Sequence, residues 1–256
     1  MGQRGARRAR VWHPLAVDFP LPLVAGTLIR REKRFLAHVL LDDGREVIAH
    51  TNNSGSMQGV CEPGRVVWLS PADGPKRKLK WTWEVVHAGP GDVPVGVNTL
   101  LPNRLVEEAI ADDRVPELTG YTSIRREVRY GSERSRIDLL LEGPPGRCWV
   151  EVKNATLVRG DRAYFPDAVT ARGLKHLREL QAMVQQGDRA ALVFTLQRSD
   201  ARSVSPADDI DPAYGVELRR AAANGVLLLA WQADVSRTAI TLARSLQVIL
   251  DPSPAS

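Results

Sequence analysis

The sequence predicts an α/β protein whose first domain is all β: a small five-stranded barrel followed by a larger mixed-sheet α/β domain. Three observations support this prediction. Residues 21–86 contain short apolar runs separated by turn residues and no strong helical pattern. Residues 88–94 are rich in glycine and proline, as expected of a link between domains. Residues 97–250 alternate between strand-like and helix-like segments, which is typical of a sheet with helical crossovers.

The first domain is expected over residues 15–87. A tight turn at Asp42-Asp43-Gly44 joins two of its strands, and a polar loop follows at residues 52–56. The five predicted strands are Leu23–Arg31, Phe35–Leu41, Arg45–Thr51, Arg65–Leu69 and Lys80–Val86. Five strands without a helix indicate a Greek-key barrel, of which the OB-fold is the commonest five-stranded case.

Cations and aromatic side chains lie close together in this first domain. Arg34 precedes Phe35 at the start of a strand, and a basic segment precedes Trp81 and Trp83. That segment contains Lys76, Arg77, Lys78 and Lys80. Interleaved cations and aromatic rings suit a groove that follows phosphates and stacks bases. The alternative is that both tryptophans are ordinary barrel residues and the basic segment is a solvated loop.

The composition favours a cytoplasmic protein that binds nucleic acid. The chain has 256 residues and a formal net charge of +5, which favours an anionic partner. Cys61 and Cys148 are its two cysteines, so neither a disulfide framework nor a cysteine-rich zinc site is expected. No run approaches the roughly 20 apolar residues of a membrane span. Residues 1–14 are predicted to be a basic flexible arm, which either adds phosphate contacts or is a solvated tail, and the oligomeric state stays open.

The second domain is expected over residues 97–250, after a linker at 88–96 and before a tail at 251–256. A helix over Leu101–Asp112 carries Glu108 at the border of its apolar face, and Tyr121–Tyr130 is an extended segment. Residues 154–165 are expected to be mostly loop. The later predicted elements are a helix from about 170 to 186, a buried strand at 190–196, a helix from 211 to 225, a strand at 226–231 and one or two strands within 236–250.

A predicted β-hairpin forms the centre of the second domain. Its strands are Ile137–Glu142 and Cys148–Lys153, joined by the turn Gly143-Pro144-Pro145-Gly146. If the turn closes symmetrically, Asp138 lies opposite Glu151, with Cβ atoms about 4.5–5.5 Å apart. Two carboxylates that close repel each other unless a cation lies between them. Lys153, two residues beyond Glu151, points to the same face. The hairpin therefore predicts a divalent metal site, for Mg²⁺ or Mn²⁺, of the kind used in phosphodiester cleavage.

The order of these groups resembles the PD-(D/E)xK nuclease superfamily, in which a glutamate-bearing helix precedes an acidic pair and a lysine. This resemblance implies a restriction-endonuclease-like domain with Asp138, Glu151 and Lys153 as catalytic residues. Asp138 and Glu151 would bind the metal, with Glu108 binding directly or through water. Arg172 and His176, one turn apart on the later helix, either contact phosphate near the metal or are solvated. The alternative for the hairpin itself is a structural, salt-bridged surface cluster.

Many separated segments between Gly26 and Leu250 together resemble one family, the sugar fermentation stimulation proteins. They include Arg30-Arg31-Glu32-Lys33-Arg34-Phe35-Leu36-Ala37, His50-Thr51-Asn52-Asn53-Ser54-Gly55-Ser56-Met57, Lys76-Arg77-Lys78, Val97-Asn98-Thr99-Leu100, Asn103-Arg104-Leu105, Glu133-Arg134-Ser135-Arg136-Ile137-Asp138, Glu151-Val152-Lys153, Tyr164-Phe165-Pro166-Asp167-Ala168-Val169-Thr170, Arg172-Gly173 and Lys175-His176-Leu177-Arg178-Glu179-Leu180. The family usually has Pro-Asn-Thr-Gly in the first-domain loop, where this chain has Asn52 and Ser54 in place of the proline and threonine. The resemblance implies an OB-like first domain, a nuclease-like second domain, DNA binding and an association with expression of sugar-utilisation genes.

Three functional hypotheses follow. The first is a DNA-binding protein of this family, linked to regulation of sugar-utilisation genes, with a retained nuclease-like metal site. Its barrel would contact the phosphates of the DNA backbone through the basic residues Arg34, Lys76, Arg77, Lys78 and Lys80. The second is an Mg²⁺- or Mn²⁺-dependent nuclease that cleaves DNA or RNA. The third is an interaction module whose acidic cluster is structural.

Overall fold

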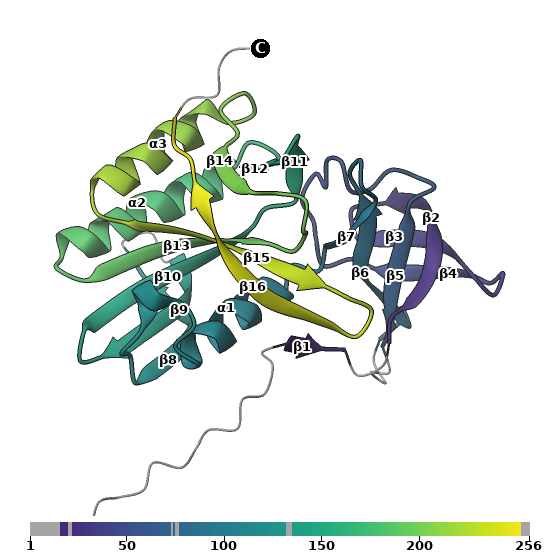
Figure 1. The fold of residues 1–256 in the computed structure, drawn as a ribbon, viewed down its shortest axis with the longest axis horizontal. Helices are drawn as coiled ribbons and strands as arrows, with labels where there is room; N and C mark the ends of the chain where they lie inside the picture. Colours follow the sequence, from purple (N-terminus) through teal and green to yellow (C-terminus); the bar gives the residue numbers. More distant parts are fainter. Residues whose placement is uncertain (1–15, 20–21, 73, 75–76, 132–134, 252–256) are drawn as a thin grey trace, which may run out of the picture.

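The computed structural model describes residues 16–19, 22–72, 74, 77–131 and 135–251. The chain forms a barrel and a larger α/β domain that lie side by side (Figure 1). The predicted arm at 1–14, the basic residue Lys76 and most of the predicted tail lie outside the described residues. In the described part of the chain, no helix is long and apolar enough to cross a membrane.

The barrel confirms the predicted five-stranded architecture. Its strands are hydrogen-bonded in the order β4-β3-β2-β5-β6, and a parallel pairing of β4 with β6, Ala49 opposite Trp81, closes the circle. Trp83 is fully buried inside and its indole N–H donates to the Val85 carbonyl oxygen at 2.9 Å. Trp83 is therefore a core residue and cannot stack a base. The strands are β2 (Val24–Glu32), β3 (Leu36–Leu41), β4 (Glu46–His50), β5 (Val66–Pro71) and β6 (Trp81–Ala88).

The segment 88–96, expected to be a linker, contains a further strand. β7 (Val93–Gly96) pairs antiparallel with β6, because the chain reverses at Gly89, whose φ of 78° lies in the left-handed region that favours glycine. The glycine and proline content here marks a hairpin turn. At the other boundary, β1 (Ala16–Asp18) pairs with the large sheet and not with the barrel, although residues 15–87 were expected to form one domain.

The larger domain is a mixed sheet with helices on both faces. Its strand order is β11-β12-β14-β16-β15-β13-β10-β9-β8, in which β10, β13 and β15 run parallel. One core lies under α1, and the other lies under α2 and α3. The strands are β8 (Ser123–Tyr130), β9 (Ser135–Gly143), β10 (Gly146–Asn154), β11 (Leu157–Arg159), β12 (Arg162–Phe165), β13 (Arg189–Leu196), β14 (Ser203–Pro206), β15 (Leu227–Val235) and β16 (Ala239–Val248). The helices are α1 (Leu101–Ala111), α2 (Ala171–Gln185), α3 (Pro212–Ala223) and the short 3₁₀ turn Pro116–Leu118.

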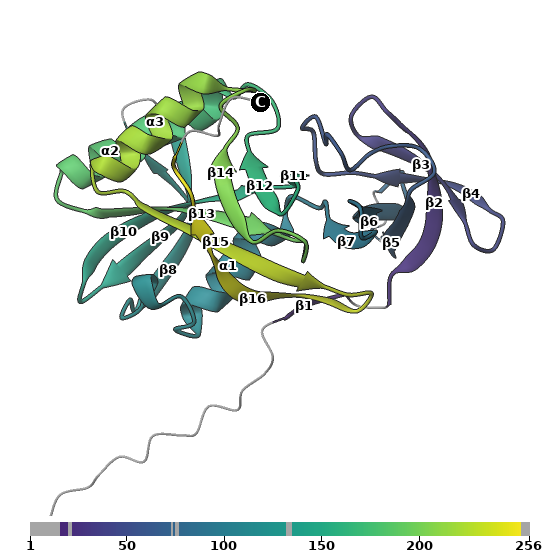
Figure 2. The same ribbon diagram turned by 45° about the horizontal axis from the view of Figure 1, so that its top comes forward.

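Two parts of this domain differ from the prediction or extend it. The segment 154–165, expected to be mostly loop, contains β11 and β12, which join the sheet through β14. The segment 236–250 forms one long strand, β16, and the β15–β16 hairpin reaches towards the barrel in both views (Figures 1 and 2). At the hairpin tip the Leu23 N–H donates to the Arg237 carbonyl oxygen at 2.8 Å. The two domains therefore share backbone hydrogen bonds at this end.

Candidate active site between the two domains

The central hairpin has the register that its turn predicts. Gly143 pairs with Gly146, and the ladder continues to Leu139 opposite Val150. The next position would set Asp138 opposite Glu151. Here the ladder changes, because the Val152 N–H donates to an Asp138 carboxylate oxygen at 2.8 Å. The two acidic residues thus lie on adjacent strands where regular pairing ends.

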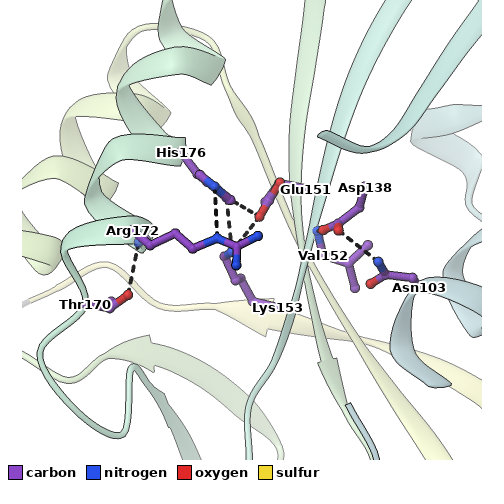
Figure 3. A network of polar contacts seen from close by, with 9 residues as sticks. Asn103, Asp138, Glu151, Val152, Lys153, Thr170, Arg172 and His176 are labelled. Atoms are coloured by element: carbon purple, nitrogen blue, oxygen red, sulfur yellow. Dashed lines mark hydrogen bonds and ion pairs between the residues drawn. The ribbon is translucent and has the colours of Figure 1, made fainter. Parts of the chain in front are cut away.

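A cavity of about 290 Å³ opens at this point. Both domains contribute to its wall: Asn53 comes from the barrel loop, and Asn103 comes from the first turn of α1. The residues lining it are Asn53, Thr99, Pro102, Asn103, Asp138, Glu151, Val152, Lys153, Asn154, Thr156, Tyr164, Phe165, Asp167 and Arg172. Asp138, Glu151 and Lys153 therefore share one cavity. Asp138 and Glu151 lie on opposite sides of the β10 backbone at Val152 (Figure 3).

Asp138 accepts two hydrogen bonds. Asn103 Nδ2 donates to Oδ1 at 2.8 Å, and the Val152 N–H occupies Oδ2. Burial, and then the nearby negative charge of Glu151, raise the pKa of Asp138 to about 6, despite these donors and Lys153. Asp138 is therefore held in a place where a carboxylate is costly, and a cation beside it would lower that cost.

Glu151 is almost fully buried and its two oxygens differ. Oε1 accepts from Lys153 Nζ at 2.5 Å and from His176 Nδ1. Oε2 is buried and has no hydrogen-bond partner among the described residues. Burial by itself raises the pKa of Glu151, but Lys153 and then His176 outweigh it, so the pKa lies below its ordinary value. Glu151 is thus a carboxylate with one oxygen left for a further ligand.

His176 lies behind Glu151 and does not line the cavity. Its Nδ1 faces Glu151, while Arg172 Nε donates to its Nε2 at 3.4 Å (Figure 3). This arrangement fits the tautomer that carries the proton on Nδ1. Arg172 lines the cavity, so a phosphate contact stays a prediction for it, whereas His176 donates to Glu151.

Glu108 does not line the cavity. Its carboxylate pairs with Arg104 Nε at 2.7 Å, one turn back along α1, and Asn103 occupies the place expected for it. Among the described residues, no group of three or more His, Cys, Asp or Glu side chains is arranged to hold a metal ion. The cavity lining contains three carboxylates, those of Asp138, Glu151 and Asp167.

The basic residues of the barrel lie in two places. Arg34 lines a second hollow, between the barrel loop and residues 165–170. Arg77, Lys78 and Lys80 lie in the β5–β6 connection, outside the lining of the central cavity, and Arg77 Nη2 donates to Thr82 Oγ1 at 3.0 Å. The barrel loop itself is fixed against the larger domain. Ser56 Oγ donates to Asp167 Oδ2 at 2.8 Å, and the Met57 N–H donates to the same oxygen.

Asn53, Asn103 and Asp167 line the cavity although they were not predicted to belong to the site. Each belongs to a segment that the sequence did mark: Asn53 lies in the polar barrel loop, Asn103 in the first turn of a predicted helix and Asp167 just before another. Nothing in the local sequence pattern shows that these segments meet.

Comparison with known proteins agrees with this two-domain architecture. The family model "Sugar fermentation stimulation protein RE domain" matches residues 100–239, and "SfsA N-terminal OB domain" matches residues 29–97. Sugar fermentation stimulation protein homologs of Geobacter metallireducens and Geobacter sulfurreducens are 62% and 58% identical; each comparison covers 90% of this chain and 99% and 97% of the respective relative. The structure of Pyrococcus furiosus SfsA in complex with Ca²⁺ superimposes with a TM-score of 0.83 at 28% identity, over 93% of this chain and 100% of that one. The chain belongs to the sugar fermentation stimulation protein family.

Proposed function

We propose that this chain is a metal-dependent nuclease that binds nucleic acid and hydrolyses a phosphodiester at Asp138, Glu151 and Lys153. The observation that carries the proposal is the unpartnered, buried oxygen of Glu151, in a cavity that also contains Asp138 and Lys153. A buried polar atom without a partner needs a physical explanation, and a bound ion would supply one. Carboxylate oxygens are the ligands that Mg²⁺, Mn²⁺ and Ca²⁺ prefer, and the Pyrococcus relative was solved with Ca²⁺.

In this proposal Asp138 and Glu151 would hold one Mg²⁺ or Mn²⁺, and water would complete the coordination, since Mg²⁺ usually takes one or two carboxylates. The ion would polarise the phosphoryl oxygens and lower the pKa of a bound water. His176 holds Glu151 in place, and Asn103 holds Asp138. Lys153, whose ammonium already lies at the carboxylate, would position the attacking water or stabilise the charge that develops on the phosphate.

The test uses the purified full chain with single- and double-stranded DNA and RNA, in Mg²⁺, Mn²⁺ or EDTA. We expect cleavage with either ion, and a loss of at least about a hundredfold in Asp138→Asn and in Lys153→Met, because each removes charge stabilisation in the transition state. Arg125→Gln, on β8, is the control, since Arg125 lies outside the cavity and pairs with Glu142. Cleavage that persists in both site variants would come from a contaminant and would refute the proposal.

The second candidate is a DNA-binding regulator that holds a metal and does not cut. The observation in its favour is that both oxygens of Asp138 already accept hydrogen bonds, from Asn103 and from Val152. DNA binding and the link to sugar-utilisation genes, which the family resemblance implies, belong to this candidate. It predicts salt-dependent binding of duplex DNA with no cleavage of any substrate in the assay above. Cleavage lost on substitution of Asp138 excludes it.

A further inference from the structure

Three hollows on this molecule are contiguous. The central cavity shares Phe165 and Asp167 with a hollow of about 520 Å³ beside the barrel, here called the barrel-side hollow. It shares Arg172 with a hollow of about 740 Å³ along α2, here called the helix-side hollow. The acidic pair therefore lies in a cavity that adjoins both larger hollows.

Arg34 is the exposed cation of the barrel-side hollow. It lies in the β2–β3 turn, and its guanidinium forms no ion pair within the described residues. Arg31, the other cation there, is occupied: its Nη2 donates to the carbonyl oxygens of Asn53 at 2.9 Å and Gly55 at 3.0 Å, which shapes the barrel loop. The single carboxylate of this lining, Asp167, accepts from Ser56 and the Met57 N–H. Arg34 is thus the group that an incoming anion would meet first.

The helix-side hollow is more basic. Its described lining contains the four cations Arg136, Arg172, Lys175 and Arg178 and one carboxylate, Glu127. Arg136 is exposed at the start of β9. Arg178 is largely exposed and its contact with Glu217 is long, at 3.8 Å. Glu217 is buried, and at 3.8 Å its contact with Arg178 is too long for a hydrogen bond, so the exposed guanidinium keeps hydrogen-bonding capacity for an anionic ligand.

The barrel-side hollow is positively charged, the central cavity contains the acidic pair, and the helix-side hollow is positively charged. A bound cation between Asp138 and Glu151 would make the centre attractive to a phosphate, and the arginines on either side would meet phosphates before and after it. A mononucleotide or a chain end would occupy only one side. The cavity volume of about 290 Å³ is at the low end for ligand sites, and walls from both domains enclose it. A space of this size favours one strand over a pair of strands.

We infer that the chain takes a single nucleic-acid strand that runs through all three hollows, with Arg34 on one side of the site and Arg136 and Arg178 on the other. This inference rests on the proposed nuclease function and adds to it the substrate class: an internal phosphodiester of a single strand. Ends are not required for binding at this site.

Binding of labelled oligodeoxythymidine in Ca²⁺, measured by fluorescence anisotropy at fixed salt, tests the path without requiring cleavage. For a 16-nucleotide strand we expect about five- to tenfold weaker binding in Arg34→Gln, and a similar loss in Arg136→Gln with Arg178→Gln. In the triple variant, which carries all three substitutions, the fold loss of affinity should equal the product of the two separate losses. A 4-nucleotide strand is the short comparison, for which the loss of affinity in the triple variant should be smaller than the product of the two separate losses. Arg45→Gln and Arg202→Gln, exposed arginines outside all three linings, are charge-matched controls.

Any of three binding results would overturn the inference: losses no larger than in the controls, a triple variant no weaker on the long strand than one parent, or a 16-base-pair duplex bound as tightly as the single strand. Circular single-stranded DNA with Mn²⁺ gives the cleavage readout. Conversion of circles to linear strands supports the inference, and digestion of linear strands alone contradicts it. If neither form is cut while the binding losses multiply as expected, the nuclease proposal fails and the strand path stands.

Discussion

At the scale of single residues, Asp138 combines burial with a negative neighbour and is costly to ionise. Its pKa of about 6 in the folded chain exceeds 3.8, the ordinary value of an aspartate in an unfolded chain. A raised carboxyl pKa means that the folded state retains the proton as pH rises. Stability is therefore lost between pH 3.8 and about pH 6, and the full penalty is present above that window. Two pKa units correspond to about 3 kcal/mol.

Asp138→Asn removes this titration, so the comparison between wild type and variant isolates it. We expect the unfolding free energy of the variant, relative to wild type, to increase by up to about 3 kcal/mol from pH 4 to pH 7 in EDTA. Urea unfolding at several pH values measures the difference, and the hydrogen bond that asparagine loses cancels because it is constant with pH. Saturating Mn²⁺ should restore stability to the wild type at pH 7 and leave the variant unchanged. A difference that does not vary with pH would contradict the assignment.

His176 acts through Glu151. Replacing it by leucine removes a buried donor from the carboxylate, which raises the pKa of Glu151 and makes a metal ion compete with a proton. We expect Mn²⁺ affinity at pH 7 to fall about tenfold in His176→Leu, as for other partners of metal ligands. The loss should be smaller at pH 8.5 than at pH 7, because a higher pH weakens the competition from the proton. Isothermal titration calorimetry measures both.

The matched control is His176→Asn, whose amide N–H lies near the position of Nδ1, can still donate to Glu151 and should retain most of the affinity. Melting curves in EDTA separate a folding defect from a binding defect. An affinity loss that is the same at both pH values would indicate a general disturbance of α2 and would contradict the positioning role.

At the scale of elements, the central hairpin was predictable and its surroundings were not. The Gly-Pro-Pro-Gly turn fixes the register as far as Leu139 opposite Val150, so the sequence could assign Asp138, Glu151 and Lys153 to neighbouring strands. It could not show that the ladder ends at Asp138, which leaves Asp138 and Glu151 on opposite sides of β10 and not directly opposed. β7 was mistaken for a linker because it is a short edge strand that contains Pro94, and proline is tolerated at an edge. β11 and β12 are strands of three and four residues, too short to show a period.

The position of α1 along its own axis explains why Glu108 was assigned to the site and Asn103 was not. The two residues are five apart, which separates them by about 7.5 Å along a helix axis. A hydrophobic face gives the rotation of a helix but not how far it slides over its sheet. Asn53 and Asp167 were missed for a related reason, because their meeting depends on how the barrel loop docks on residues 165–170.

At the scale of the whole molecule, hydrogen bonds join the two domains in addition to the covalent chain. The Gly96 N–H donates to the Gln197 carbonyl oxygen at 2.8 Å, so β7 continues the hydrogen bonding of the barrel into the large domain. A second junction connects residue 23 to the β15–β16 hairpin, and a third connects Ser56 to Asp167. A site whose walls come from both domains requires such a fixed arrangement.

This arrangement predicts a single cooperative unfolding transition for the full chain. A substitution at Gly96 should uncouple the unfolding of the two domains. A Cβ at Gly96 would lie 2.6 Å from Gln197 Oε1 and 2.8 Å from Gln197 Cβ, so Gly96→Ala must push β7 away from residue 197. We expect differential scanning calorimetry to show one transition for wild type and two for Gly96→Ala. Gly91→Ala is the control in the same segment, because its Cβ would meet only Val93 Cγ1, at an ordinary 3.6 Å.

Binding of Mn²⁺ should survive in Gly96→Ala, since Asp138 and Glu151 both belong to the larger domain. Binding of the 16-nucleotide strand should weaken, since Arg34 moves with the barrel. Two transitions in wild type, or one in every variant, would show that the domains do not depend on the β7 junction.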